Sequence, residues 1–264
     1  SISWSTGDPV EGDRFVGKQE IVTGALSLIK KHGCVGIMGG PGTGKTSIID
    51  RVTEKLIKDG VIVSSVDVLL SSQNLDHVKE NIEDKRKKVG SKGRIALLVD
   101  GDGLNQVQTP LILEHMSLLK EEGDVIVMGV YGDYRYHPGI SEAARSACKN
   151  LIGDYCVVNR LMNDVEMRKV INRNGRTVFA PKVEAYIVEQ AGGHPFLAGI
   201  IASCIFGEIM GNKLDNKEIE WEYFWKLVES EAVLRMMGNT GDFGRSMRYV
   251  KEAGFDPRTW EFSG

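Results

Sequence analysis

Hydrophobic and polar residues follow two different periods along the first 160 residues of the chain. Short, mostly apolar runs of the kind that form strands buried on both faces recur along this stretch. These runs are 34–38, 61–67, 95–100, 125–130 and 155–158. Stretches with helical periodicity precede or separate them, at 18–31, 46–59, 75–87, 110–121 and 141–150. This alternation predicts a three-layer α/β domain around a five-stranded, mainly parallel sheet.

The strand-like runs end at Arg160, and only helical periodicity follows. Helices are predicted at 165–173, 181–190, 195–210 and 217–237, which indicates a smaller all-α subdomain. We therefore expect a flexible N-terminal arm at 1–13, an α/β domain at 14–160 and a helical lid subdomain at 161–237. The last segment, 238–264, is rich in glycine and charge and is left unassigned.

The composition is that of an ordinary globular protein: 264 residues, 42% hydrophobic, 26% charged, with a formal net charge of -3. Nothing in this balance is typical of a nucleic-acid or membrane-surface protein. Cys34, Cys148, Cys156 and Cys204 form no CxxC pair, so we expect free thiols, mostly buried, in a reducing cytoplasmic (intracellular) compartment. The longest apolar run, 196–210, is shorter than the ~20 residues that span a bilayer, which argues against a membrane partner.

Residues 39–46 read GGPGTGKT and fit the phosphate-binding pattern GxxxxGK[ST] in full. The segment follows a predicted strand and opens a predicted helix, which is the context that such a loop requires. We expect Lys45 to bridge the β- and γ-phosphates of ATP or ADP, and the Thr46 hydroxyl to bind Mg²⁺. A simple glycine-rich turn is the alternative. The expected nucleotide-binding residues here are Gly39, Gly40, Pro41, Gly42, Thr43, Gly44, Lys45, Thr46 and Ser47.

An apolar run that ends in a carboxylate, at 95–100, matches the second acidic site of such proteins. Asp100 would lie at the carboxyl end of its strand and hold Mg²⁺ through water. In the ATPases that carry a catalytic glutamate, it usually comes directly after this aspartate, but Gly101 stands here. Asp102 could reach the attacking water, or it could be a turn carboxylate. We therefore expect slow hydrolysis.

These motifs together resemble the AAA+/STAND group of P-loop ATPases, particularly the archaeal-type ATPases. Residues 15–20, FVGKQE, resemble the FVGRexE box, with lysine in place of arginine. The resemblance implies that Phe15 and Val16 lie near the adenine. The turn AGGHPF at 191–196 resembles the GxP turn, in which the proline, here Pro195, contacts the base. A plain helix start and a plain helix–turn–helix junction would look the same.

Two further roles follow from this resemblance. Asp133 follows the fourth predicted strand, where these families carry a polar sensor residue near the γ-phosphate. Arg145 is the best-placed arginine finger for a neighbouring subunit, with Arg160 behind it. A surface-loop carboxylate and a solvated helix arginine are the respective alternatives.

The resulting hypothesis is an ATP-dependent molecular switch with a helical lid, a slow ATP hydrolase able to form a homo-oligomer. The aromatic residues at 221–225 pack on the lid or dock a protein partner. The alternative is an AAA+ regulator or initiator that assembles on DNA in replication or transposition. The basic residues at 85–88 favour DNA, but acidic neighbours and the net charge do not. A small-molecule kinase would need an acceptor pocket, and the sequence shows no sign of one.

Overall fold

The computed structural model describes residues 17–40, 42–90, 93–101, 103–132, 134–136, 139–172, 179 and 181–212, and the backbone of 255–256 and 261–262. Two compact units divide the chain. The α/β unit comprises Lys18–Gly40 and Lys45–Arg160. The helical unit comprises Ser1–Gly17, Pro41–Gly44 and Leu161–Gly264. The domain boundaries at residues 14–160 and 161–237 stay a prediction.

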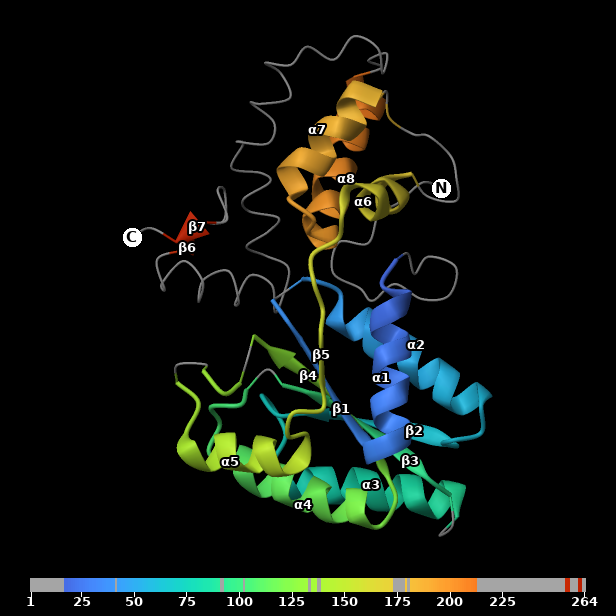
Figure 1. Ribbon diagram of the computed structural model, residues 1–264, viewed down its shortest axis with the longest axis vertical. Coiled ribbons are helices and arrows are strands. Elements are labelled where there is room, and N and C mark those ends of the chain that lie inside the picture. The colour runs from blue at the N-terminus through green and yellow to red at the C-terminus, as the bar shows by residue number, and fades with distance from the viewer. Residues whose placement is uncertain are drawn as a thin grey trace. The chain divides into compact units, whose positions relative to one another are not determined.

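Strands and helices alternate through the whole α/β unit, as the sequence predicts (Figure 1). The strands are β1 (Cys34–Gly39), β2 (Ser64–Leu69), β3 (Ile95–Asp100), β4 (Val125–Tyr131) and β5 (Cys156–Val158). The helices are α1 (Gln19–His32), α2 (Lys45–Lys58), α3 (Leu75–Val89), α4 (Thr109–Glu121) and α5 (Glu142–Leu151). All strand pairs of this five-stranded sheet are parallel, and the order is β2-β3-β4-β1-β5. The predicted α/β fold is therefore confirmed.

β4 lies between β3 and β1 in the sheet. Its register places Gly129 level with Ile37 of β1 and with Asp100 of β3. Gly39, the last residue of β1, is paired with Tyr131. Parallel strands end at one edge of their sheet, so the ends of β1, β3 and β4 share the edge where α/β proteins bind ligands. β4 therefore separates β3, which ends at Asp100, from β1, which leads into the phosphate loop.

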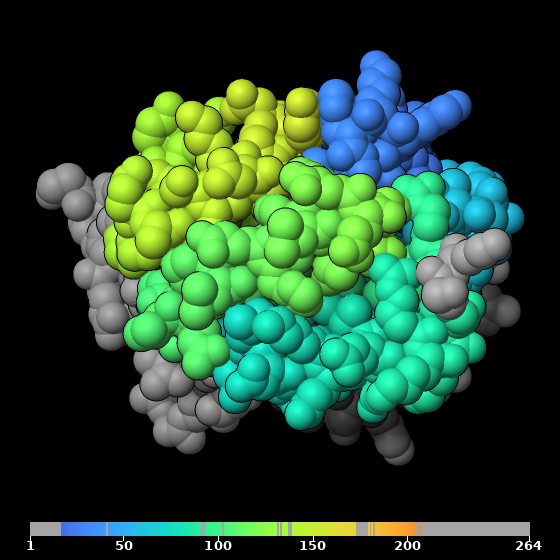
Figure 2. Space-filling model, turned by 90° about the horizontal axis from the view of Figure 1, so that it is seen from below, coloured from blue at the N-terminus to red at the C-terminus, as the bar shows by residue number. Residues whose placement is uncertain are grey.

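The helices cover both faces of the sheet. α1 and α2 lie on one face, and α3, α4 and α5 lie on the other (Figure 1). The latter three are side by side in the view from below (Figure 2). Alternate strand residues face these three helices, and among them Leu97, Val99 and Met128 are fully buried. This two-sided burial explains why the strands read as nearly continuous apolar runs.

β2 begins three residues later than the sequence predicts, at Ser64 in place of Val61. Gly60, with a φ of 67°, ends α2, and the N–H groups of Val61 and Ile62 bond back to the Leu56 carbonyl. Val61 and Ile62 therefore belong to the turn that ends α2, and the Ile62 side chain is buried there. An apolar run in the sequence does not separate such a wrapping turn from the start of a strand.

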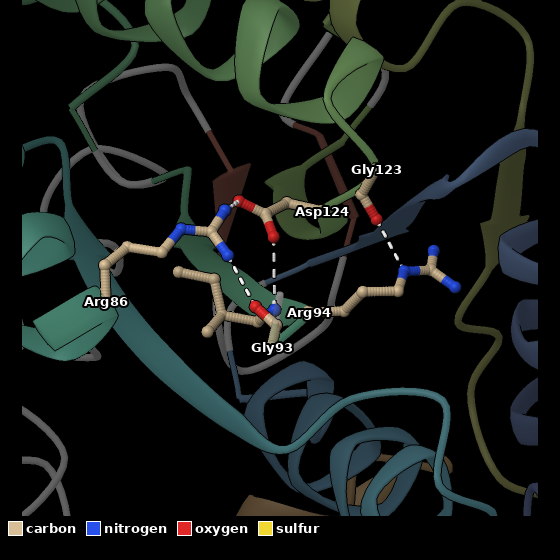
Figure 3. Close-up of polar contacts among 6 residues, drawn as sticks. Arg86, Gly93, Arg94, Gly123 and Asp124 are labelled. Carbon is tan, nitrogen blue, oxygen red and sulfur yellow. Dashed lines mark hydrogen bonds and ion pairs between the residues drawn. The ribbon is translucent and has the colours of Figure 1, made fainter. Parts of the chain in front are cut away.

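A buried carboxylate joins the amino ends of β3 and β4 (Figure 3). Asp124, only 2% exposed, accepts hydrogen bonds from the Ile95 N–H at 3.1 Å and from the Arg86 guanidinium. Arg86 also donates to the Gly93 carbonyl at 2.5 Å, and Arg94 Nε donates to the Gly123 carbonyl at 2.6 Å. Both arginines thus form hydrogen bonds with backbone or side-chain oxygens at the end of the sheet opposite the phosphate loop.

The helical unit contains α6 (Asp164–Ile171), α7 (Pro181–Ala191) and α8 (Pro195–Asn212), as well as the short pair β6 (Phe255–Asp256) and β7 (Glu261–Phe262). Its core is a separate cluster that includes Met167, Ile187 and Ile200. Glu184, 7% exposed, accepts hydrogen bonds from Arg168 and Asn172 and so joins α7 to the end of α6. The first three predicted lid helices are present, whereas the one predicted at 217–237 lies outside the described residues.

The cysteines are free where the structure describes them: Cys34 and Cys148 are buried, and Cys156 is half-buried. Cys204 lies in α8, and its side chain is outside the described part. No helix in the part of the chain that the structure describes has the length and apolarity needed to cross a membrane.

Candidate functional site

The phosphate loop runs from the end of β1 to the start of α2. Gly42 and Gly44 adopt φ values of 65° and 89°, a region that side-chain-bearing residues rarely enter. A Cβ added to Gly44 would meet no atom within 4 Å, so the requirement for glycine there comes from the backbone conformation. α2 then begins at Lys45, and the start of a helix is where an anion is bound most favourably.

Lys45 is 8% exposed and folds back over the beginning of the loop. Its ammonium donates to the Gly40 carbonyl at 2.7 Å and to the Gly39 carbonyl at 3.0 Å. The Gly39 carbonyl also accepts from the Gly132 N–H at 3.3 Å, which joins the loop to the end of β4. These bonds hold the lysine side chain in place at the start of the loop and restrict its conformational freedom.

The residues that follow Gly44 differ in exposure. Thr46 is exposed in the first turn of α2, which leaves its hydroxyl accessible to a metal ion, while Ser47 is half-buried. Thr43 is 4% exposed. Magnesium usually binds through substrate phosphates, one hydroxyl and one or two carboxylates, with water completing its shell. The glycine conformations and the exposed Thr46 hydroxyl fit a nucleotide with its metal.

Asp100 is half-buried at the carboxyl end of β3 and supplies the only described carboxylate at the end of this strand. Asp100 is paired with Gly129 of β4, which fixes its position along the sheet. One strand separates β3 from β1, a distance of about 10 Å between the two backbones from the usual strand spacing. The predicted contact of Asp100 with Mg²⁺ through water stays a prediction.

Several of the predicted site residues lie outside the part of the chain that the structure describes. These are Phe15, Val16, Pro41, Asp102 and Asp133. Their roles stay predictions from the sequence. In the sequence, Asp102 and Asp133 each come two residues after the last residue of a strand, β3 and β4 respectively.

Arg145 lies in the first turns of α5, which starts from the same edge of the sheet because it follows β4. Its side chain is half-buried, with Nη2 3.4 Å from the Ile140 carbonyl. Its Nε is buried and has no hydrogen-bond partner among the residues that the structure describes. Arg160, the second candidate, instead forms an ion pair with Glu20 at 2.7 Å. The finger role of Arg145 stays a prediction.

The turn before Pro195 has a packing reason for its glycines. Gly192 and Gly193 have φ values of 53° and 82°, and a Cβ on Gly193 would lie 2.5 Å from the Met162 carbonyl oxygen. The Met162 N–H donates to the Gly193 carbonyl at 2.8 Å, and α8 begins at Pro195. The predicted helix start is thus present. Pro195 belongs to the helical unit, and its contact with a base stays a prediction.

The sequence analysis noted Lys18 only as a departure from the FVGRexE box and missed its buried contact near the phosphate loop. Lys18, 2% exposed, has a left-handed φ of 59° and donates to Asn159 Oδ1 at 2.6 Å. The Asn159 N–H in turn donates to the Met38 carbonyl at 2.6 Å, directly before the loop. The two side chains are 141 residues apart, so no local pattern could have paired them. The bond fixes the start of α1 to the end of β5.

Comparison with solved structures finds similar folds at low sequence identity. Domain III of the replication initiation protein DnaA from Thermotoga maritima is 15% identical, with 84% of this chain and 98% of that chain covered and a TM-score of 0.59. Aeropyrum pernix ORC1 in complex with DNA is 13% identical, with 93% and 80% covered and a TM-score of 0.61. A Walker-type ATPase of Pyrococcus abyssi is 9% identical, with 93% and 79% covered and a TM-score of 0.59.

No protein-family model matches the chain, and no curated protein sequence matches it. At these identities the structural likeness establishes the fold, which is the α/β P-loop NTPase fold that AAA+-type ATPases share.

Proposed function

We propose that this chain binds ATP with Mg²⁺ at its phosphate loop, hydrolyses it slowly and acts as a nucleotide-dependent molecular switch. The single observation that carries the proposal is the seating of Lys45 on the Gly39 and Gly40 carbonyls at the start of α2. An ammonium at the start of a helix that follows a glycine-rich loop suits a phosphate group. The fold shared with AAA+-type ATPases supports the proposal.

Each residue would act through its own chemistry. The loop N–H groups and the start of α2 would hold the β-phosphate, and Lys45 would neutralise charge between the β- and γ-phosphates. Thr46 and Asp100 would hold Mg²⁺, the latter through water. Bound Mg²⁺ would supply charge stabilisation as the γ-phosphoryl group leaves. Asp102, Asp133 and Arg145 would orient water or sense the γ-phosphate, and Phe15, Val16 and Pro195 would contact the base.

Replacing Asp102 with asparagine tests the proposed water-orienting role. Loss of a general base or water-orienting group costs on the order of 100-fold or more in rate, whereas ground-state binding does not need it. We therefore expect single-turnover ATP hydrolysis to slow by that factor while the Kd for ATP stays within about twofold of wild type. An unchanged rate would remove Asp102 from the mechanism.

A second candidate function is a regulator that assembles on DNA. Specific support comes from the folds of the replication initiation protein DnaA and of ORC1, which was determined in complex with DNA. The basic stretch in α3 supports it less. Arg86 is engaged by Asp124, and Lys87 lies 3.1 Å from Asp84, so two of its basic side chains already have acidic partners. DNA binding is therefore left as the alternative.

The mass of the protein in solution separates the two candidates. Light scattering would compare the apo, ADP-bound and non-hydrolysable-ATP-bound protein, each with and without duplex DNA. A nucleotide switch with an arginine finger in trans predicts assembly with the ATP analogue alone. A DNA-assembling regulator predicts assembly only when both the analogue and DNA are present, with a strong dependence on salt. A monomer in every state would contradict assembly of this chain in either role and leave it a nucleotide-binding module that acts with another partner.

Arg145→Ala tests the finger directly. If Arg145 completes the site of a neighbouring copy, the variant should bind ATP as wild type does but hydrolyse it about 1,000-fold more slowly within the assembly. Mixing Arg145→Ala with a Lys45→Ala variant supplies the control, because mixed assemblies pair an intact finger with an intact phosphate loop. A finger in trans predicts recovered hydrolysis in the mixture, and a residue acting only within its own subunit predicts none.

A further inference from the structure

Two glycines follow Asp100 and flank position 102, and each is pressed against a neighbouring backbone. The Gly101 N–H donates to the Gly129 carbonyl at 2.8 Å, so the contact between the third strand and β4 continues past Asp100. A Cβ built on Gly101 would lie 2.1 Å from that same carbonyl oxygen. Any side chain at position 101 would therefore break the bond that now exists there.

Gly103 makes the corresponding contact on the other side. Its φ is 97°, and a Cβ there would lie 2.6 Å from both N and Cα of Ser71, in the turn that follows β2. Its carbonyl accepts hydrogen bonds from Thr109 Oγ1 and from the Gln106 N–H, each at 2.9 Å. Thr109 is fully buried at the first position of α4. Contacts with β4 and with the turn after β2 thus hold Gly101 and Gly103 in place.

We propose that Gly101 and Gly103 are positioning residues that clamp the end of the third strand and so aim the Asp100 carboxylate at the nucleotide-bound metal. This inference rests on the proposed ATP and Mg²⁺ binding. The same contact limits which residue can occupy position 101. Some of the ATPases that this chain resembles carry a catalytic glutamate directly after the aspartate, and position 101 has no room for its side chain. The contact that positions the metal-binding group therefore excludes a water-activating group from the adjacent position.

The test measures how much Mg²⁺ strengthens nucleotide binding, as the ratio of the Kd for a fluorescent ATP analogue in EDTA to the Kd in Mg²⁺. Groups that orient a metal ligand typically affect metal affinity by about 10- to 100-fold. We expect Gly101→Ala and Gly103→Ala to lower the ratio by about that factor, with the Kd in EDTA unchanged. A purely structural role would lower the melting temperature and leave the ratio as in wild type.

Matched controls separate the clamp from general glycine effects. A Cβ on Gly24 of α1 meets only Val157 Cγ1, at 3.4 Å, so Gly24→Ala adds a methyl group without a backbone clash. Gly90 has a φ of 82° and open space around it, so Gly90→Ala reproduces the strain expected at Gly103 without the contact. Neither control should change the Mg²⁺ ratio.

Two less disruptive variants, a test and its control, keep the inference testable if the glycine variants do not fold. Thr109→Val removes the hydroxyl that bonds the Gly103 carbonyl, and Thr53→Val removes a buried hydroxyl that bonds the Ile49 carbonyl at 2.8 Å within α2. We expect Thr109→Val alone to lower the Mg²⁺ ratio, by a few-fold.

A ratio that stays at the wild-type value in Thr109→Val and in every folded glycine variant overturns the inference. Wild-type protein that binds no ATP would instead overturn the proposed function itself.

Gly101→Glu tests the closed position. We expect this variant to lose Mg²⁺-dependent binding and to hydrolyse ATP no faster than wild type, because its backbone must move away from Gly129 to accommodate the side chain. Faster hydrolysis with the wild-type Mg²⁺ ratio would show that position 101 accepts an activating carboxylate, and would overturn the exclusion.

Discussion

Replacing Lys45 with alanine is expected to weaken ATP binding by at least about 100-fold, because the loop loses its charge-assisted bonds to two phosphates. The folded lysine donates to the Gly39 and Gly40 carbonyls, so the variant also loses two hydrogen bonds of the apo protein. Those carbonyls lie at the start of a half-exposed loop where water can replace the ammonium, and we expect the cost in stability to be about 1 kcal/mol. Calorimetric titration with Mg-ATP measures the first effect.

Lys58→Ala is the control for this prediction. Lys58 is an exposed residue in the last turn of the same helix, so its removal changes the net charge equally but leaves the phosphate loop intact. We expect its Kd for ATP to stay within about twofold of wild type. A Lys45→Ala protein that binds ATP as tightly as Lys58→Ala would contradict the assignment of the phosphate site.

The second large effect is expected at the opposite end of the sheet. Asp124→Ala should lower the free energy of unfolding by about 3 to 5 kcal/mol, because it leaves the Arg86 guanidinium and the buried Ile95 N–H without their carboxylate. The ion pair and the strand contact are drawn in Figure 3. Urea unfolding followed by circular dichroism measures the change. Asp84→Ala removes an exposed ion pair with Lys87 and should cost less than about 0.5 kcal/mol.

The pH dependence of Asp124→Asn gives an independent check. Burial raises the pKa of the Asp124 carboxyl above its ordinary value, and the bonds from Ile95 and Arg86 offset this only in part. A raised folded pKa means that the native state binds the proton more tightly than the unfolded chain does. The stability that wild type holds relative to Asp124→Asn should therefore grow as pH falls through the folded pKa. A difference that shrinks on acidification would show that Arg86 outweighs burial.

Sequence analysis predicted the parts of this protein that depend on local pattern. The run at 95–100 is a strand with the predicted bounds, because apolar side chains on both faces leave few other structures. The phosphate loop was equally clear, since the glycines and Lys45 are needed at fixed spacing. The start of β2 was placed wrongly, because Val61 and Ile62 pack as a helix end that looks apolar in the same way.

The contacts that join distant segments could not be predicted from the sequence. Nothing in the local pattern around Lys18 indicates that its ammonium reaches Asn159, and the position of β4 between β1 and β3 is a property of the whole sheet. The sequence analysis noted that Gly101 stands where related ATPases carry a catalytic glutamate. Its contact with Gly129 gives the physical reason, which required the register of two strands to be known.

The position of β4 also has a consequence for the order in which the protein can fold during synthesis. β1 has no strand neighbour among residues 40–124, since its partners are β4 and β5. A nascent chain that has released β2 and β3 can pair those two, but the first strand must wait until residue 131 has left the ribosome. Such long-range parallel pairing is slow. The phosphate loop is thus synthesised before the strands that pair with β1. A partly synthesised chain would therefore lack a competent nucleotide site.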